Sequence, residues 1–199
     1  MSGEELSREK VGAVKKNVKI AISGKSGCGN TTITSLTAER LGLRFINFTF
    51  RNLARENNMP LEEVLHLAEI DDYWDKTVDR RQIEAALSDD ERGCVLGSRL
   101  AIWLLKDADL KVYLKGDTDV RTRRLMAREG GSFEEVAAFT KERDTRDHAR
   151  YLRLYNIDND DYAFADLIID TNLYTPDEIV SQIINWYRIY AGLTVPQAR

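Results

Sequence analysis

The segment "GKSGCGNTT", from Gly24 to Thr32, combines glycines, a lysine and hydroxyl side chains in an order that suits phosphate binding. Gly24 and Gly29 have the G-x-x-x-x-G spacing, and Thr31 lies just inside the helix expected to follow. Glycines allow successive N–H groups to turn toward one anion, and a helix N-terminus adds partial positive charge. A threonine hydroxyl at this place is suited to a magnesium ion that bridges two phosphates. The segment therefore predicts a phosphate-binding loop.

This loop departs from the usual pattern at Asn30, which stands where such loops carry a lysine. Phosphoryl transfer depends mainly on positioning and charge stabilisation, and a neutral amide cannot replace an ammonium group. Lys25 directly follows the first glycine, and its four-carbon side chain is long enough to fold back over a bound phosphate. We hypothesise that Lys25 supplies the displaced charge. An ordinary exposed lysine is the alternative that the residues leave open.

Arginine and aromatic side chains follow two of the apolar runs that we expect to be strands. Phe50 and Arg51 come just after the run "LRFINF", and Arg99 comes just after "CVLGS". In open α/β sheets ligands bind at the carboxyl ends of the strands, and arginine holds phosphate through two parallel hydrogen bonds. These positions predict an anion site next to the glycine loop.

Three carboxylates in "IDDYWDKTVDRRQIE" recur at four-residue steps. Asp71, Asp75 and Asp79 are therefore expected on one face of a helix. Such a row is either a solvated face or a set of hydrogen-bond acceptors for a base amino group or for sugar hydroxyls.

A later segment is rich in arginine. Arg143, Arg146 and Arg150 have spacings that place them on one helical face. Glu142, Asp144 and Asp147 neutralise many of the arginines in this segment. The rest suit a lid that closes over the loop, excludes water and neutralises the transferring group. The eight arginines are Arg121, Arg123, Arg124, Arg128, Arg143, Arg146, Arg150 and Arg153.

Short apolar runs alternate with segments of helical periodicity, which predicts an α/β fold with a mostly parallel sheet and crossover helices. The connections over about 49–92 and 117–162 are too long for one helix each, so we expect two helical insertions over a shared cleft. A final helix begins at Pro176. The five expected strands are "VKIAIS" from Val18, "LRFINF" from Leu43, "CVLGS" from Cys94, "LKVYL" from Leu110 and "DLIID" from Asp166.

Composition narrows the class of protein. A chain of 199 residues fits one domain, and a formal net charge of −4 argues against a general nucleic-acid binder. No apolar run approaches the ~20 residues of a membrane span, and the charged N-terminus lacks a signal-peptide pattern. We expect a cytoplasmic protein, a monomer, with Cys28 and Cys94 as reduced thiols.

Taken together, these motifs resemble the nucleoside monophosphate kinases of the P-loop class, most closely the short, archaeal-type cytidylate kinases. The likeness runs from about Val18 to Ile184. It rests on "SGKSGCGNTT", "TFRNLARENNMPLEEV", "WDKTVDRRQ" and "VLGSRLAIWLLKDADLKVYL", and more specifically on "VRTRRLMAREGGSFEE" and "KERDTRDHARYLRLYNIDNDDY".

The resemblance implies a three-layer P-loop fold with a five-stranded parallel sheet. Residues 18–191 would form one kinase domain, with an insertion for the nucleoside monophosphate at about 49–92 and an arginine-rich lid at about 117–162. Residues 1–17 would be an N-terminal extension, and residues 192–199 a C-terminal tail.

The resemblance also implies transfer of the γ-phosphoryl of ATP to CMP or dCMP, with magnesium held by Thr31. Lys25, Arg128, Arg143 and Arg150 would be catalytic. The nine loop residues would bind ATP, namely Gly24, Lys25, Ser26, Gly27, Cys28, Gly29, Asn30, Thr31 and Thr32. Acceptor binding would fall to Phe50, Arg51, Asp75, Asp79, Arg99, Tyr151 and Asp158.

A second departure concerns the end of the third strand. Gly97 and Ser98 stand where related kinases commonly have an acidic residue that helps hold magnesium. Two alternatives therefore stay open: a nucleotide-binding regulatory protein without turnover, and a P-loop kinase for another small acceptor. His66 and His148 receive no catalytic role, because in-line transfer to an acidic phosphate needs no strong base.

Overall fold

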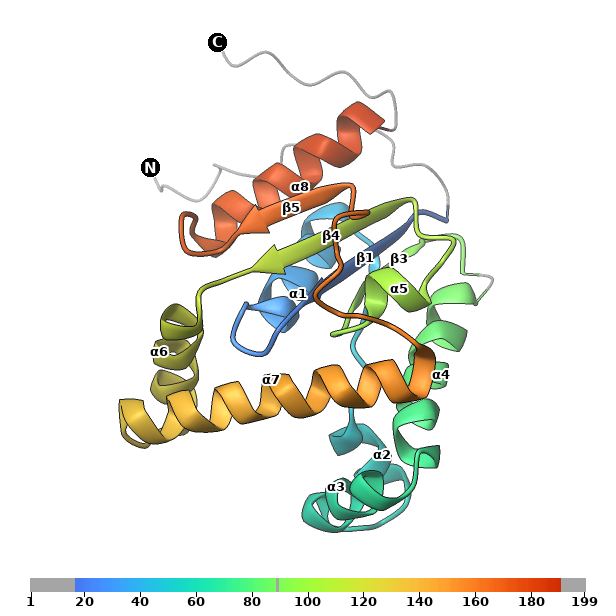
Figure 1. Ribbon diagram of the computed structural model, residues 1–199. Helices are drawn as coiled ribbons and strands as arrows, with labels where there is room; N and C mark the ends of the chain where they lie inside the picture. The colour runs from blue at the N-terminus through green and yellow to red at the C-terminus, as the bar shows by residue number, and fades with distance from the viewer. Residues whose placement is uncertain (1–16, 89, 191–199) are drawn as a thin grey trace, which may run out of the picture.

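A five-stranded, wholly parallel sheet forms the centre of the computed structural model, which describes residues 17–88 and 90–190 (Figure 1). The strand order is β2-β3-β1-β4-β5. The predicted α/β class and parallel sheet are therefore confirmed. The strands are β1 (Lys19–Gly24), β2 (Arg44–Ile46), β3 (Cys94–Gly97), β4 (Leu110–Lys115) and β5 (Leu167–Asp170).

Alternation along the strands divides the core between the two faces of this sheet. In β1, Ile20 and Ile22 face one cluster and Ala21 faces the other. The first cluster lies under α1 (Asn30–Leu41) and α8 (Pro176–Tyr190), and the second under α5 (Ala101–Leu104) and the end of α4 (Tyr73–Leu87). The result is a helix–sheet–helix arrangement that fixes the carboxyl ends of β1, β3 and β4 at one edge.

The connection between β2 and β3 contains α2 (Phe50–Glu56), α3 (Leu61–Ile70) and α4. Leu53 and Val64 pack with Val78 in a small core of their own. The expectation that Asp71 shares a helical face with Asp75 and Asp79 is wrong. Asp71 ends α3 in an extended conformation, and its carboxylate accepts a hydrogen bond from the N–H of Tyr73, so only the other two carboxylates lie on α4.

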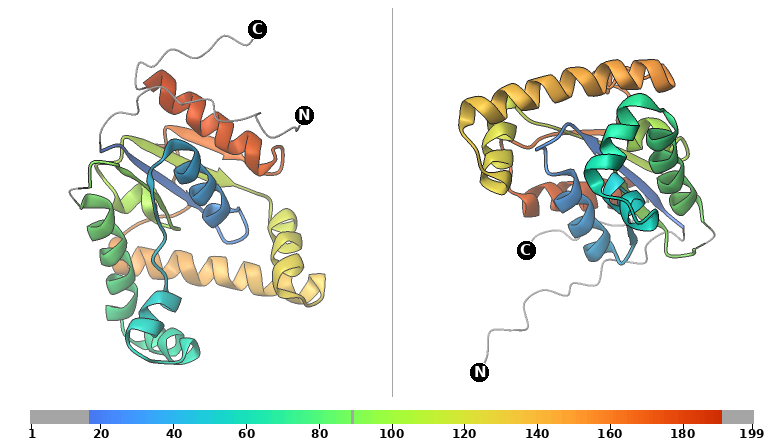
Figure 2. Two further views of the ribbon diagram at one scale, coloured as in Figure 1. Left: turned by 180° about the vertical axis from the view of Figure 1, so that it is seen from behind. Right: turned by 90° about the horizontal axis from the view of Figure 1, so that it is seen from below.

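The connection between β4 and β5 contains α6 (Thr118–Glu129) and the long helix α7 (Phe133–Tyr155). Ser132 and Glu135 form a capping box at the start of α7, and Asn156 ends it in the left-handed conformation. Helix α7 runs across the carboxyl ends of the strands, from α6 to α4 (Figures 1 and 2). It therefore forms one wall over the edge where the glycine loop lies.

Within the described residues, no helix is both long and apolar enough to cross a membrane. The expected C-terminal tail, and the N-terminal extension apart from Asn17, lie outside the described residues.

Candidate functional site

The glycine loop connects β1 to α1 and is packed against α6. Gly27 has φ +85°, and a Cβ there would lie 2.9 Å from the Cβ of Arg121, so the close approach requires glycine. Arg121 donates a hydrogen bond to the carbonyl of Ser26 at 3.1 Å, and Arg124 donates one to the carbonyl of Gly27 at 3.4 Å. Two arginines thus hold the loop by two of its carbonyl groups. Inside the loop, the N–H of Cys28 donates a hydrogen bond to the carbonyl of Lys25 at 3.1 Å.

Asn30 links the start of α1 to the start of the loop. Its Nδ2 donates a hydrogen bond to the carbonyl of Gly24 at 2.6 Å, and its Oδ1 is buried without a hydrogen-bond partner among the described residues. The amide therefore fixes the shape of the loop but brings no positive charge to it.

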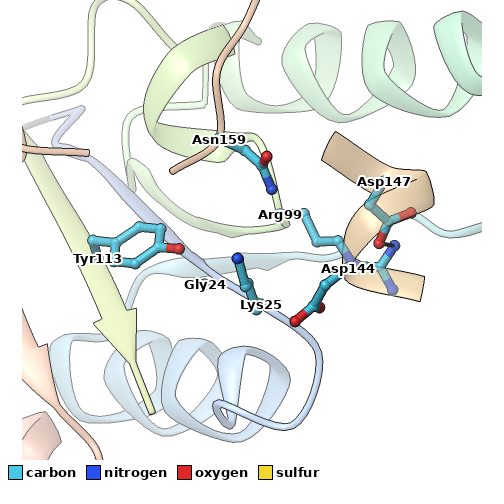
Figure 3. Close-up of a pocket in the computed structure, with 7 residues that line it drawn as sticks. All are labelled: Gly24, Lys25, Arg99, Tyr113, Asp144, Asp147 and Asn159. Carbon is cyan, nitrogen blue, oxygen red and sulfur yellow. Dashed lines mark ion pairs between the residues drawn. The ribbon is translucent and has the colours of Figure 1, made fainter. Parts of the chain in front are cut away.

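Lys25 lies in the loop with its ammonium group at the carboxylate of Asp160, 2.6 Å away. Asp160 belongs to the segment that follows α7. A cavity of about 10 Å³ is lined by Lys25 together with Arg99, Tyr113 and Asp147 (Figure 3). It is about the size of one water molecule and is therefore too small for a nucleotide, but a larger cleft adjoins it.

That cleft has a volume of about 930 Å³ and begins at the glycine loop. Its size lies within the range of small-molecule sites. All nine loop residues line it. The other predicted site residues that line it are Phe50, Arg51, Asp75, Asp79, Arg99, Arg128, Arg143, Arg150 and Tyr151.

Asp158 is the exception among the predicted site residues, because it is exposed and does not line the cleft. Its carboxylate lies 3.6 Å from Nδ1 of His148. His148, Asp158 and Asp160 could together hold a metal ion, but the first of them also contacts Asn159 and the last pairs with Lys25. We therefore leave Asp158 out of the proposed acceptor site.

One carboxylate on α7 organises the arginines at the floor of the cleft. The carboxylate of Asp147 forms one ion pair with Arg99 and another with Arg150, each at 2.7 Å. Tyr151 is buried next to them and hydrogen-bonds to Arg99. Because Asp147 and Tyr151 offset the cost of burial, the pKa of Arg99 is raised and the guanidinium stays charged. The two arginines are held at fixed positions for an incoming anion.

Arg143 lies one α7 turn before Asp147 and has a different environment. No carboxylate lies within ion-pair distance of it among the described residues. Burial, and then the charge of Arg99, lower its pKa. A guanidinium that is partly desolvated and beside a like charge favours binding of an anion, because an anion would relieve both effects.

The side of the cleft that was predicted to bind the acceptor contains two carboxyl groups on α4. Burial raises the pKa of Asp79 to about 6, although the hydroxyl of Tyr155 donates a hydrogen bond to it at 2.7 Å. Burial also raises the pKa of Asp75, against the effect of Arg150 at 3.5 Å. Both carboxyl groups come from α4 and contact side chains of α7, so this wall of the cleft depends on contact between the two insertions.

The residues around Thr31 suit a magnesium ion. The hydroxyl of Thr31 faces the cleft, and Nδ2 of Asn47 donates a hydrogen bond to it at 3.2 Å. Hydroxyl and amide carbonyl oxygens are the hard ligands that Mg²⁺ accepts beside phosphate and water. When bound with ATP, the ion would neutralise phosphate charge next to the loop.

Sequence analysis missed several residues of this site. Asn47 follows β2 directly, but it lay inside the longer expected strand "LRFINF", so the rule that selected Arg51 and Arg99 passed over it. Asp147 was expected only to neutralise arginines of its own segment, and its pair with Arg99 could not be found in that way. The same holds for the contact of Tyr155 with Asp79, because both contacts depend on where α7 meets β3 and α4. Arg121 and Arg124 were assigned to a lid, whereas they hold the loop itself.

Known proteins with similar sequences identify the family of this chain. The model of the Cytidylate kinase-like family matches residues 19–173. The chain is 48% identical over 170 residues to Cytidylate kinase 2 of Borreliella afzelii (strain PKo), covering 83% of this chain and 94% of the relative. It is 41% identical over 167 residues to Cytidylate kinase of Pyrococcus horikoshii, covering 83% of this chain and 85% of the relative.

Solved structures support the fold. An uncharacterized protein from Eubacterium ventriosum has a TM-score of 0.64 at 20% identity, covering 87% of this chain and 99% of its own. Shikimate kinase from Bacteroides thetaiotaomicron has a TM-score of 0.57 at 18% identity, covering 88% of this chain and 99% of its own. The extent of the family match and the identity to the curated relatives, together with a glycine loop that opens into an arginine-lined cleft, show that the chain belongs to the cytidylate kinase-like family.

Proposed function

We propose that this protein is a cytidylate kinase that transfers the γ-phosphoryl group of ATP to CMP or dCMP and produces CDP or dCDP with ADP. The family membership and the named relatives support this assignment. The single structural observation that carries it is the meeting of arginines from four parts of the chain on one cleft beside the glycine loop. They are Arg51 of α2, Arg99 after β3, Arg128 of α6, and Arg143 and Arg150 of α7.

In this proposal the glycine loop binds the phosphates of ATP and Thr31 holds magnesium. Arg99, Arg143 and Arg150 neutralise the acceptor phosphate and the transferring group, since catalysis of phosphoryl transfer consists mostly of positioning and charge stabilisation. Arg51, Phe50 and the α4 carboxyl groups bind the acceptor nucleotide. Arg128 lines the cleft and forms an ion pair with its neighbour Glu129, and its side chain is 64% exposed, so it is free to turn inward when the cleft closes.

Lys25 supplies the charge that Asn30 lacks. Its pair with Asp160 is partly exposed, with 27% of the Lys25 side chain and 52% of the Asp160 side chain accessible. Pairs of this kind are weak, so a triphosphate with several negative charges competes well for the ammonium group. A cytoplasmic location and a monomeric state complete the proposal as expectations from the sequence.

An ADP-release assay tests the reaction with CMP, dCMP, UMP, AMP and GMP as acceptors. The wild type should turn over CMP or dCMP best, and Lys25→Ala should lower kcat by about 100-fold, as loss of one donor to a transition-state charge does. Adding Asn30→Lys to Lys25→Ala should restore part of the rate, because it returns a lysine to the usual place in the loop. Lys106→Ala, at an exposed lysine away from the cleft, is the matched control.

Three results would contradict parts of the proposal. An undiminished rate in Lys25→Ala would exclude the displaced lysine. Faster turnover of an acceptor other than CMP or dCMP would make the protein a kinase for that acceptor. Tight ATP binding without turnover of any acceptor would instead identify a regulatory nucleotide-binding protein.

A further inference from the structure

The proposed magnesium site lacks a carboxylate at the end of β3, one of the two strands that pair with β1. Strand β3 ends at Gly97 and is followed by Ser98, and neither carries a charge. A side chain at Gly97 is not accommodated, because its Cβ would lie 2.2 Å from Oγ1 and 2.8 Å from Cβ of Thr34 on α1. Helix α1 is therefore packed against β3 too closely for an acidic group at that position.

The other carboxylates of the cleft are also engaged. Among the described residues, the acidic side chains that line the cleft are Asp75, Asp79 and Glu129. Asp75 lies by Arg150, Asp79 accepts a hydrogen bond from Tyr155, and Glu129 pairs with Arg128. None of these three pairs includes Thr31.

Asn47 carries an amide group next to Thr31. It follows β2 directly, lines the cleft, and places its amide against the Thr31 hydroxyl at 3.2 Å. One half of the amide orients the hydroxyl, and the other half, the carbonyl oxygen, is a hard neutral ligand of the kind that binds Mg²⁺ or one of its water ligands.

We infer that Asn47 is the positioning residue of the magnesium site, where it takes the place of the absent carboxylate by orienting the Thr31 hydroxyl and binding the hydration shell of the ion. The inference rests on the proposed role of Thr31 as the magnesium ligand. Because Asn47 is neutral, this site has one negative charge less than a magnesium site with a carboxylate at the end of β3. The ion is consequently held mainly by the phosphates of ATP and not by the free protein.

Binding of a non-hydrolysable ATP analogue, measured by calorimetry with Mg²⁺ and again with EDTA, tests this inference without turnover. The measured quantity is the ratio of Kd in EDTA to Kd in Mg²⁺. Loss of an outer-shell partner typically costs 10- to 100-fold in metal affinity. Asn47→Ala should therefore lower the ratio by about tenfold while leaving Kd in EDTA nearly unchanged.

Asn47→Asp gives a prediction of opposite sign. A carboxylate at this position repels the triphosphate, so Kd in EDTA should rise, yet it attracts the ion, so the ratio should exceed that of the wild type. Asn57→Ala is the matched control, since it removes an amide from outside the cleft. Thermal unfolding without nucleotide checks that each variant is folded.

Thr31→Ala separates the two levels of the proposal. If Thr31→Ala lowers the ratio and both Asn47 variants keep the wild-type ratio, the role of Asn47 is overturned while Thr31 remains the ligand. If Thr31→Ala keeps the wild-type ratio, the ion is not bound at Thr31, and both the proposed ligand and the role of Asn47 are overturned.

Discussion

The ammonium group of Lys25 and the carboxylate of Asp160 lie 2.6 Å apart and connect the phosphate-binding loop to the segment that follows α7. The pair thus joins the part of the cleft that would bind ATP to the end of the helix that carries the acceptor-side arginines. A phosphate that attracts Lys25 also frees Asp160. Binding of ATP and movement of the segment after α7 are therefore expected to be coupled.

Asp160→Asn should strengthen binding of a non-hydrolysable ATP analogue, because Lys25 no longer has to leave a carboxylate. A partly exposed ion pair contributes up to about 1 kcal/mol, so the gain in affinity should be at most about fivefold. Asp161→Asn, at the exposed neighbour, is the control. In a Lys25→Ala background the Asp160 substitution should have no effect, and an equal gain there would show that the lysine is not involved.

Arg121→Met should destabilise the protein and weaken ATP binding together. Arg121 is buried and pairs with Asp144 at 2.6 Å, so its removal leaves a poorly solvated carboxylate, a change that typically costs about 3–5 kcal/mol. It also removes the donor to the Ser26 carbonyl in the glycine loop. Urea unfolding and binding of the ATP analogue measure the two effects.

Arg123→Met is the control for this change. Arg123 lies on the same helix but is exposed, and its guanidinium lies over the ring of Phe133. The substitution Arg123→Met should lower the free energy of unfolding by well under 1 kcal/mol. Equal effects of the two substitutions would contradict a specific role for Arg121 in holding the loop.

The sheet and most of the cleft were readable from the sequence because local patterns determine them. Alternation in "VKIAIS" and "LKVYL" reflects which residues face each core, and the ends of these runs indicate where ligands bind. Asp71 was misplaced because four-residue spacing does not reveal that a chain leaves one helix and starts another between Asp71 and Tyr73.

Pairings between distant segments were not readable in this way. The length of the Lys25 side chain indicated that it could reach a bound phosphate. No local pattern indicated that Asp160 would lie beside it. The same holds for Asp79 and Tyr155, whose contact depends on α7 being long enough to reach α4. Tertiary structure determines which charged side chains form ion pairs. Among the described residues, the other arginines of α7 lie within ion-pair distance of a carboxylate and Arg143 does not.

Gly97→Ala should destabilise the protein because it forces α1 away from β3. A Cβ at this position would lie 2.2 Å from Oγ1 of Thr34, and overpacking of this kind costs about 1–3 kcal/mol. Thr34→Ala alone should be tolerated, since its hydroxyl is buried without a hydrogen-bond partner among the described residues. In urea unfolding, the double variant should lose less stability than the sum of the two single changes, whereas additive losses would show that this contact does not limit the packing.

Asp79 should make the stability of the protein depend on pH in a defined window. Burial raises the pKa of Asp79 from an ordinary value of 3.8 to about 6 in the native state. Between these values the folded protein holds the proton and the unfolded chain does not, so this contribution to stability falls as pH rises from about 4 to 6. The wild type should therefore lose up to about 3 kcal/mol relative to Asp79→Asn across this window and no more above it.

Tyr155→Phe tests the cause of this dependence. The hydrogen bond from Tyr155 lowers the pKa of Asp79, so its removal should move the titration of Asp79 above pH 6 and extend the window upward. NMR titration of the Asp79 carboxyl carbon measures the shift directly, and Tyr73→Phe, at an exposed tyrosine of the same helix α4, is the control. A carboxyl that titrates near 4 in the wild type, or one unmoved by Tyr155→Phe, would mean that Asp79 is open to water and that α7 does not close this wall of the cleft.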